Sequence, residues 1–335
     1  MNDEPAGRLA EIGEQGIIEI VARAARDIGD DCAVLDLGAG DQRLLVSTDL
    51  LLERVHFRSR FMPARKLGWK SLAVNLSDIA AMGGRAQAAL LAFGLRADLD
   101  AGWVREFMDG LAACARRHGV DLVGGDTVRS DRDLAICLTV LGLAREDELL
   151  RRRGARPGDL IYLGRPTGDS AAGLALLESE SERSEDLDPE ARSQLIAAHL
   201  EPAPQLELGR LLAERHLASA AIDVSDGLLQ DLGHLCSQSG VGAELEADGL
   251  PVSEAARRLA EALGTQALDW ALSGGEEYCL LFCCPEPREA EMLAACEAQL
   301  DLRPIPAGRI VEGSGLRVRV GGSWIIPSRF GYSHF

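Results

Sequence analysis

Residues 44–57 contain the stretch LLVSTDLLLERVHF, in which an apolar run is followed by three oxygen-bearing side chains. The apolar residues 44–46 predict a short buried strand that ends at Ser47, Thr48 and Asp49. Ligands of α/β proteins gather where strands end, and hard cations prefer oxygen donors. Because Ser, Thr and Asp are also common in turns, this stretch alone leaves an ordinary polar turn as the alternative.

The association of an apolar segment with acids recurs along the chain, which favours a ligand site over isolated turns. It occurs in IGDD (28–31), NLSD (75–78), VGGD (123–126) and IDVSD (222–226), and SGGEEY (273–278) places two glycines beside two acids. Paired glycines let backbone N–H groups approach a ligand closely, and a phosphate would suit that position. The acids of interest are Asp30, Asp31, Asp49, Asp78, Asp126, Asp223, Asp226, Glu276 and Glu277.

Length and composition exclude several classes of protein. The 335 residues suffice for two domains, and the 47% hydrophobic content allows large cores. A net charge of −18 argues against nucleic acid or an anionic membrane as partner. No apolar run has the length of a membrane span and the N terminus is acidic, so we expect a cytoplasmic protein. The eight cysteines include no CxxC pair and are expected to be buried thiols.

Hydrophobic periodicity predicts an α/β fold of alternating helices and strands. The helix predicted at 66–82 is mostly apolar but carries Ser71, Asn75 and Asp78 on one face. This stripe suits either a metal or ligand or hydrogen bonds to neighbouring backbone. Further helices are predicted at 8–26, 103–118, 202–216 and 228–237, and strands at 32–35, 88–95, 120–123, 134–143, 160–163, 220–222, 279–284, 317–320 and 324–326.

A basic segment, RRRGARPGD at 151–159, interrupts the acidic chain where its composition changes. We place a domain boundary there, between an N-terminal α/β domain over 1–145 and a C-terminal α/β domain over 146–335. The segment is either a solvated linker or the source of an arginine that binds phosphate. The acidic stretch 178–190 is expected to be a surface loop without chemistry.

Motifs of other phosphate-binding and metal-binding classes are missing from the sequence. GxxxxGK[ST], HRD and DFG do not occur, and no GxGxxG follows a predicted strand. His56 is the one histidine near the acid motifs, which argues against zinc. Oxygen donors without imidazole or thiolate favour Mg²⁺. Several Mg²⁺ ions would let these acids bind a polyphosphate and would stabilise charge during phosphoryl transfer.

Taken together, the motifs resemble the thiamine-monophosphate kinase family, within the aminoimidazole ribonucleotide synthetase-like superfamily. The resemblance rests on GDD (29–31), STD (47–49), VHF (55–57), NLSDIAAMG (75–83), VGGDT (123–127), RPGD (156–159), GDSAAGLAL (168–176), IDVSDGL (222–228), SGGEEY (273–278) and GY-HF (331–335). It implies a two-domain fold with mixed sheets covered by helices. It also implies a homodimer paired through the N-terminal domains, with ATP near that interface.

The resemblance further implies an activity and its residues. The activity is ATP-dependent phosphorylation of thiamine monophosphate to thiamine diphosphate by direct in-line transfer with several Mg²⁺ ions and no phosphoenzyme; K⁺ is a further candidate ion. The implied metal ligands are Asp30, Ser47, Thr48, Asp49, Asp78, Asp126, Asp223 and Asp226. The implied ATP contacts are Gly125, Asp126, Arg152 and Ser225, and those to the thiamine end are His56, Glu276 and Tyr332.

The sequence departs from the family pattern mainly at the substrate end. Glu277 and Ser333 stand where the family usually has Asp, and Arg153 replaces a small residue beside Arg152. Two other functions stay open at this point. One is another ATP-dependent synthetase of the superfamily, which would use a nitrogen substrate. The other is a non-catalytic nucleotide-binding paralogue, which is expected to lose metal acids that are present here.

Overall fold

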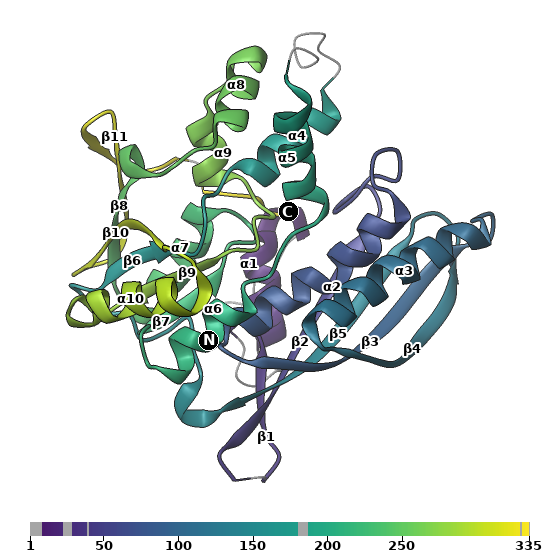
Figure 1. The fold of residues 1–335 in the computed structure, drawn as a ribbon, viewed down its shortest axis with the longest axis horizontal. Helices are drawn as coiled ribbons and strands as arrows, with labels where there is room; N and C mark the ends of the chain where they lie inside the picture. Colours follow the sequence, from purple (N-terminus) through teal and green to yellow (C-terminus); the bar gives the residue numbers. More distant parts are fainter. Residues whose placement is uncertain (1–8, 23–28, 39, 180–186, 329, 335) are drawn as a thin grey trace.

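The computed structural model describes residues 9–22, 29–38, 40–179, 187–328 and 330–334. The described elements form two mixed sheets with helices against them (Figure 1). The first sheet has the order β1-β2-β5-β3-β4, from β1 (Ala33–Asp36), β2 (Gln42–Leu52), β3 (Arg85–Arg96), β4 (Asp121–Ser130) and β5 (Ala135–Arg145). This arrangement confirms the predicted fold class of mixed sheets covered by helices.

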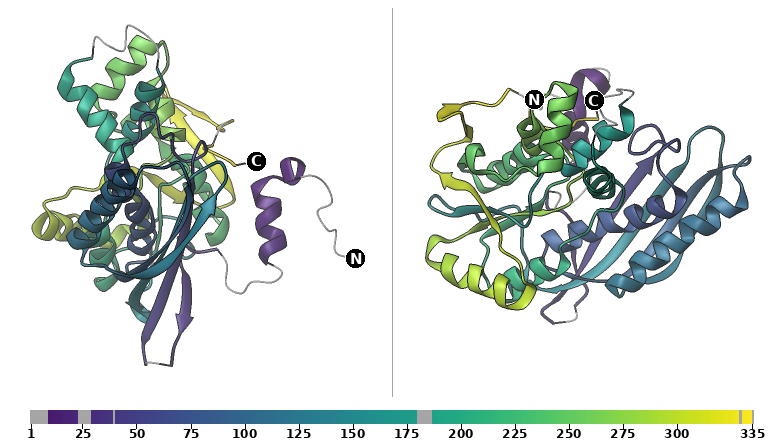
Figure 2. Two further views of the ribbon diagram at one scale, coloured as in Figure 1. Left: turned by 90° about the vertical axis from the view of Figure 1, so that its right-hand side faces the viewer. Right: turned by 45° about the horizontal axis from the view of Figure 1, so that its top comes forward.

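Two long helices, α2 (Ala64–Ala81) and α3 (Ala101–His118), cover one face of the first sheet. In the left view of Figure 2, α1 (Leu9–Ala22) stands apart from the sheets, on the side away from α2 and α3. β1 pairs antiparallel with β2, the next strand along the chain. β4 is the outer strand and pairs parallel with β3, which makes the sheet mixed.

The second sheet has the order β12-β11-β8-β10-β6-β9-β7. Its strands are β6 (Leu160–Leu163), β7 (Ala220–Asp223), β8 (Gly242–Glu246), β9 (Leu280–Cys284), β10 (Ile305–Val311), β11 (Gly315–Val320) and β12 (Ser323–Ile325). The helices of this half are α4 (Asp169–Glu178), α5 (Pro189–Leu200), α6 (Leu206–Glu214), α7 (Leu228–Ser239), α8 (Glu254–Leu263), α9 (Ala267–Ser273) and α10 (Glu289–Leu300). The remaining described helix is α1 (Leu9–Ala22).

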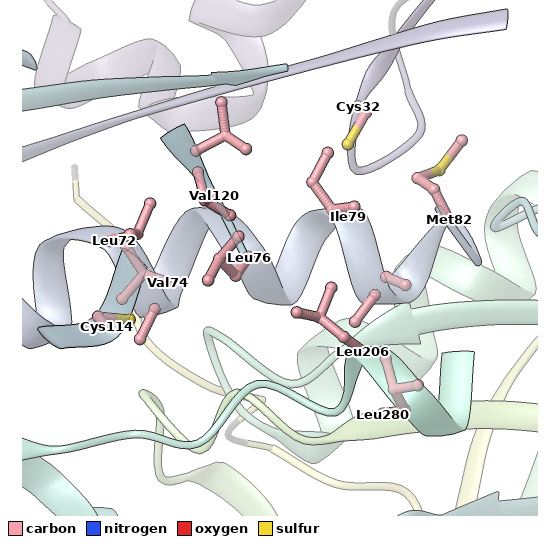
Figure 3. Close-up of a cluster of buried hydrophobic side chains, with 14 of the residues drawn as sticks. Cys32, Leu72, Val74, Leu76, Ile79, Met82, Cys114, Val120, Leu206 and Leu280 are labelled. Atoms are coloured by element: carbon pink, nitrogen blue, oxygen red, sulfur yellow. The ribbon is translucent and has the colours of Figure 1, made fainter. Parts of the chain in front are cut away.

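α2 lies between the two sheets and joins their cores. Leu72 and Ile79 of this helix are fully buried (Figure 3). In the same view Leu206 of α6 and Leu280 of β9 lie on the far side of the helix from Cys32, and all of these residues belong to one apolar cluster. A helix that is apolar nearly all round is expected in such a buried position. The polar stripe of α2 is therefore surrounded by core.

The acid-bearing segments differ from their sequence-based prediction in one important respect. The strand predicted over 44–46 continues to Leu52, so Ser47, Thr48 and Asp49 lie inside β2. Likewise Asp126 lies inside β4. Because side chains alternate across a strand, neighbours in these motifs point to opposite faces of the sheet.

Most of the other predicted elements are confirmed, with shifts at their ends. The helix predicted at 202–216 is shorter and begins after the prolines, at Leu206. The helix predicted at 8–26 is described over Leu9–Ala22, with a non-helical Gly13, and its remaining residues lie outside the described ranges. The loop predicted at 178–190 lies partly outside them, and α5 begins at Pro189. The elements α5, α8, α9, α10, β8 and β10 were not predicted.

Glycines let α2 and α3 approach each other at van der Waals distance. A Cβ on Gly110 of α3 would lie 1.8 Å from the carbonyl oxygen of Arg65, and one on Gly68 of α2 would lie 2.0 Å from that of Phe107. Both clashes are with backbone, so a side-chain rotation does not relieve them. The helix pair therefore has to separate if either glycine gains a methyl group.

We predict that Gly110→Ala lowers the free energy of unfolding by about 3 kcal/mol, in the range of overpacking substitutions. Urea denaturation followed by circular dichroism measures this change. Gly249→Ala is the matched control, because a Cβ at this position would meet nothing within 4 Å and its φ is not positive. Equal stability of the two variants would contradict the close packing of α2 on α3.

Candidate functional site

The acid motifs of β2 and α2 meet at the buried face of the first sheet. Ser47 Oγ donates a hydrogen bond to the Asp78 carboxylate. The backbone N–H of Asp49 donates to Asn75 Oδ1 over 3.1 Å, and Asn75 Nδ2 donates to the carbonyl of Ser71. Both functions expected for the polar stripe thus occur. Ser71 and Asn75 form hydrogen bonds with the backbone, whereas Asp78 belongs to an acidic cluster.

Three carboxylates from distant parts of the chain form the centre of this cluster. One oxygen each of Asp31, Asp78 and Asp223 lies within 4.8 Å of the others. Asp223 ends β7, and its Oδ2 accepts a hydrogen bond from Ser77 Oγ over 2.6 Å. Asp31 Oδ2 is buried and has no hydrogen-bond partner. A buried carboxylate oxygen without a partner suits a cation ligand.

Burial makes the charged form of these acids unfavourable. It raises the pKa of Asp223 to about 7 and that of Asp49 to about 6, against an ordinary value of 3.8. The pKa of Asp78 is also raised well above that value, first by burial and then by the charges of Asp49 and Asp223. Clustered hard oxygens with this electrostatic cost fit a divalent cation such as Mg²⁺.

The loop after β7 adds further polar groups beside the cluster. Asp231 of α7 accepts hydrogen bonds at one carboxylate oxygen from the backbone N–H groups of Ser225, Asp226 and Gly227, each 3.1 Å long. Burial raises the pKa of the Asp226 carboxyl, whose Oδ2 accepts from Gln230 Nε2. Asp231 therefore fixes the loop that carries Ser225 and Asp226.

A cleft of about 640 Å³ connects this acidic end to a second group of predicted residues. Its lining includes Asp49, Asp78, Asp223, Ser225 and Asp226 of the acidic end, and also His56, Glu276 and Tyr332. The lining is partly apolar, with Phe57, Leu174 and Trp270. An apolar wall with few polar groups is typical of a small-molecule site.

His56 and the C-terminal segment lie together at this second end. His56 Nδ1 accepts a hydrogen bond from the N–H of Leu52, which leaves Nε2 to carry the proton of the neutral ring. Burial and then His334 lower the pKa of His56. The His334 ring lies 5.1 Å from that of His56 and 5.0 Å from that of Tyr332. Tyr332 is held by its N–H, which donates to the carbonyl of Asp226 over 3.0 Å.

Glu276 is held at the cleft wall by two cationic or polar partners. Lys70 Nζ lies 2.9 Å from Glu276 Oε1, and His199 Nδ1 lies 3.3 Å from Oε2. The Glu276 backbone has φ 63°, a left-handed conformation that a non-glycine residue rarely adopts. Its N–H donates to the carbonyl of Ser225 over 2.6 Å, which links this loop to the acidic end.

The structure does not bring every implied metal ligand into the cluster. Asp30 points away from it and accepts from Arg151 Nη1 and from the N–H of Arg152, both at 3.0 Å. Asp31 occupies the position in the cluster that the resemblance implied for Asp30. Because the two acids are adjacent, the motif alone did not decide which one points inward.

Thr48 and Asp126 lie away from the cluster because of strand alternation. Thr48 Oγ1 donates to the carbonyl of Leu138 on the open side of β2. Asp126 pairs with Ala92 of β3 and is exposed, and its Oδ1 accepts from the N–H of Thr127. Three strand spacings, about 14 Å, separate β4 from β2. Gly125 of β4 is equally distant from the cluster.

Arg152 lies against the cluster and neutralises part of it. Its Nη2 is 2.5 Å from Asp31 Oδ1, and its Nε is 3.1 Å from the same oxygen. The basic segment therefore belongs to the site and is not a solvated linker at this residue. Arg153 beside it is exposed.

The family departure at Glu277 falls outside the cleft. Its side chain is buried, and its Oε1 accepts from the N–H groups of Gly168 and Ser170 at the start of α4, over 2.7 and 3.1 Å. Burial raises its pKa to about 7. Glu277 thus caps a helix, and a longer carboxylate at this position changes a structural contact.

Sequence reasoning missed three residues of the site, Lys70, His199 and Asp231. Lys70 carried a signal, since a lysine within the apolar segment LGWKSLAV of a core helix calls for a buried partner. His199 and Asp231 carried none, because neither the sequence around His199 nor that around Asp231 differs from an ordinary helical segment.

The comparisons with known proteins agree with this fold. Residues 29–144 match the family described as AIR synthase related protein, N-terminal domain, and residues 156–321 match its C-terminal domain. The fold is also shared with the hydrogenase maturation protein HypE of E. coli, at 23% identity and a TM-score of 0.71. Fold and acidic cleft therefore define a protein of the AIR synthase related class.

Closer relatives narrow the class to one family. The thiamine-monophosphate kinase of Salmonella typhimurium is 45% identical over 77% of this chain and 76% of its own length, and that of Aquifex aeolicus is 34% identical over 98% and 100%. A solved structure described as AaThiL complexed with AMPPCP and TMP has a TM-score of 0.87 at 33% identity and covers 99% of this chain and 100% of its own. The chain belongs to the thiamine-monophosphate kinase family.

The acidic cluster yields a prediction for the metal-free protein. An acid with a raised folded-state pKa binds its proton more tightly when folded, so its contribution to stability is lost as pH rises from the ordinary value of 3.8 through about 7. We predict that the Tm in EDTA falls over this range and that Asp78→Asn raises the Tm at pH 7.5 by about 3 °C.

Differential scanning fluorimetry in EDTA and in Mg²⁺ measures both effects. Mg²⁺ should raise the Tm of the unaltered protein and raise that of Asp78→Asn less. Asp98→Asn is the control, because the Asp98 side chain is 79% exposed. A lower Tm for Asp78→Asn than for the unaltered protein in EDTA at pH 7.5 would show that repulsion does not dominate the cluster.

Proposed function

We propose that this chain transfers a phosphoryl group from ATP to thiamine monophosphate, which gives thiamine diphosphate. The observation that carries the proposal is the single cleft that joins an acidic cluster to a partly apolar end containing Glu276 and His56. Two phosphate-bearing substrates fit the acidic end only with cations, and a ring-bearing substrate fits the apolar end. Relatives named thiamine-monophosphate kinase support this assignment.

Phosphoryl transfer to thiamine monophosphate requires little proton transfer by the protein. A phosphate monoester has a second pKa near 6, so its attacking oxygen already carries negative charge at neutral pH. Phosphoryl transfer then depends mainly on positioning and on stabilising charge. We therefore propose direct in-line transfer without a covalent enzyme intermediate, and no general base is assigned.

Mg²⁺ would neutralise charge between the phosphates and the acids of the site. Asp31, Asp49, Asp78 and Asp223 are the residues that would hold it, supported by their convergence and by the unpartnered oxygen of Asp31. Ser47 orients Asp78, and Asp226 lies beside the same end of the cleft. Asp126 would hold a separate ion, since it lies on the outer strand. The role of K⁺ and a cytoplasmic location stay predictions.

ATP would lie at the acidic end, near the basic segment. Arg152 is the guanidinium at this end that would contact a phosphate, since it already lies against Asp31. Ser225 lines the same cleft and is presented by the loop that Asp231 fixes. The contacts of Gly125 and Asp126 with ATP stay predictions, because β4 lies about 14 Å from β2 and its acidic cluster. The thiamine end of the acceptor would then contact His56, Glu276 and Tyr332.

We predict that Asp49→Asn lowers kcat at least about 100-fold, the scale of losing one charge-stabilising group, while the fold is kept. The assay contains purified protein, ATP, Mg²⁺ and thiamine monophosphate, and thiamine diphosphate is quantified by chromatography. Asp98→Asn should retain full activity, because its side chain is exposed and outside the cleft. Unchanged turnover of Asp49→Asn would exclude the metal assignment, and no thiamine diphosphate from the unaltered protein would exclude the function.

We also propose that the chain forms a homodimer through the open face of the first sheet. Leu35, Leu50, Leu90 and Val128 lie on this face and are exposed, although large apolar side chains are usually buried. Leu50 shares a row with Cys137 and Ala92, and Leu90 shares one with Thr139. A second copy of the sheet is the partner that presents the same apolar rows.

We predict that Leu90→Arg converts the dimer to a monomer, because a charge would be buried at the centre of the face. Size-exclusion chromatography with light scattering measures the mass at fixed protein concentration. Ile326→Arg is the control, since Ile326 is 80% exposed and follows β12 of the other sheet. A monomeric unaltered protein, or a dimeric Leu90→Arg variant, would contradict pairing through this face.

A further inference from the structure

Lys70 is a buried cation that the proposed chemistry does not use. Its side chain is 0% exposed, in the middle of α2. Nζ donates to the carbonyl of His199 over 2.9 Å and lies 2.9 Å from Glu276 Oε1. A lysine is rarely buried in this way unless it has a partner. Glu276 is the carboxylate that lies within reach.

The partner acid remains open to the cleft. The Glu276 side chain is 25% exposed and lines the cleft, whereas Lys70 lies behind it and does not. His199 Nδ1 approaches Oε2, and Ser170 Oγ lies 3.3 Å from the same nitrogen. Both oxygens of the Glu276 carboxylate therefore have a protein partner, and the side chain still lines the cleft.

Burying Lys70 beside Glu276 lowers the stability of the fold relative to a well-packed apolar pair. A buried ion pair often stabilises less than apolar residues of the same size. Glu276 and Tyr278 both have positive φ, 63° and 48°, which strains non-glycine residues. A merely structural contact could be made at lower cost. The strain and the buried charge keep one carboxylate fixed at the cleft wall.

The charges around Glu276 agree with its being ionised. Burial raises the pKa of Glu276, but the charge and hydrogen bond of Lys70, whose Nζ lies 2.9 Å from Oε1, act against burial, so the pKa lies below its usual value. Burial and Lys70 lower the pKa of His199 to about 4, so its imidazole is neutral. Lys70 belongs to α2, His199 to α5 and His56 to the segment after β2. Tyr278, two residues after Glu276, stays protonated, because burial and then the charge of Glu276 raise its pKa.

We propose that Lys70 is a positioning residue for the acceptor substrate, which holds Glu276 ionised and aimed at the thiamine end of thiamine monophosphate. The inference rests on the proposed function in one respect, the contact between Glu276 and thiamine. Thiamine carries a cationic thiazolium and an aminopyrimidine N–H donor, and a fixed carboxylate recognises either group. Lys70 acts through Glu276 and touches neither ATP nor the transferred phosphoryl group.

The test is a double-mutant cycle of Lys70→Met and Glu276→Gln, read in the KM values for both substrates and in kcat. We expect Lys70→Met to raise the KM for thiamine monophosphate about 10-fold or more, with the KM for ATP within about twofold. In the Glu276→Gln background, Lys70→Met should change neither KM by more than about twofold. The double variant leaves no unpaired buried charge, so it stays informative if Lys70→Met alone does not fold.

Lys66→Met is the matched control, one turn earlier on α2, because Lys66 is surface-exposed and pairs with Glu201. It should leave both KM values unchanged. Calorimetric titration with thiamine monophosphate measures the same double-mutant cycle in the Kd, without turnover. If the unaltered protein forms no thiamine diphosphate, the proposed function is refuted, but the Kd values still test the role of Lys70. Additive effects of the two substitutions, or an effect of Lys70→Met on ATP alone, would overturn the proposal.

Discussion

Mutual repulsion among buried carboxylates is the constraint on which the rest of the structure depends. Asp31, Asp78 and Asp223 come from three separate segments, and folding forces one oxygen of each within 4.8 Å of the others. The packing of α2 between the two sheets holds them there, since the helix contributes to a core cluster that reaches both sheets. Arg152 offsets the charge of Asp31 and also acts on Asp223, but burial still raises the pKa of Asp223 to about 7. The Mg²⁺ ions proposed for this site would supply the positive charge that offsets the repulsion.

The carboxylates at the two ends of the cleft have pKa values shifted in opposite directions. At the acidic end, burial and neighbouring acids raise the pKa of Asp78 and Asp223, so the charged form is favoured only when cations arrive. At the other end, Lys70 lowers the pKa of Glu276 despite its burial, so the carboxylate carries its charge without a ligand. Under the proposed function, the acids of one end would become charged when metal ions bind, whereas Glu276 would already be charged when the organic cation arrives.

The sequence predicted the fold class and the core helix well, because apolar periodicity and the Ser71–Asn75–Asp78 stripe are local properties. It predicted less well where the outcome depends on which way a residue points. Asp30 and Asp31 are neighbours, and only tertiary packing turns Asp31 inward. The acids of β2 were expected after the strand, whereas pairing with β5 extends the strand through Leu52. The sequence did not indicate that His199 belongs to the site, because its role depends on contacts with Lys70 and Glu276, which are far away in the sequence.

β2 connects the acidic cluster to the open sheet face by simple alternation. Ser47 is buried beside Asp78, whereas Leu50 and Thr48 lie on the uncovered side. A slip of one residue in this strand would exchange the two sets and move a carboxylate out of the cluster. Pairing with β5 over the full length of β2 fixes its register. Covering the open face with a second chain would fix it further, and so the same strand that supplies the metal end also links that end to the proposed dimer.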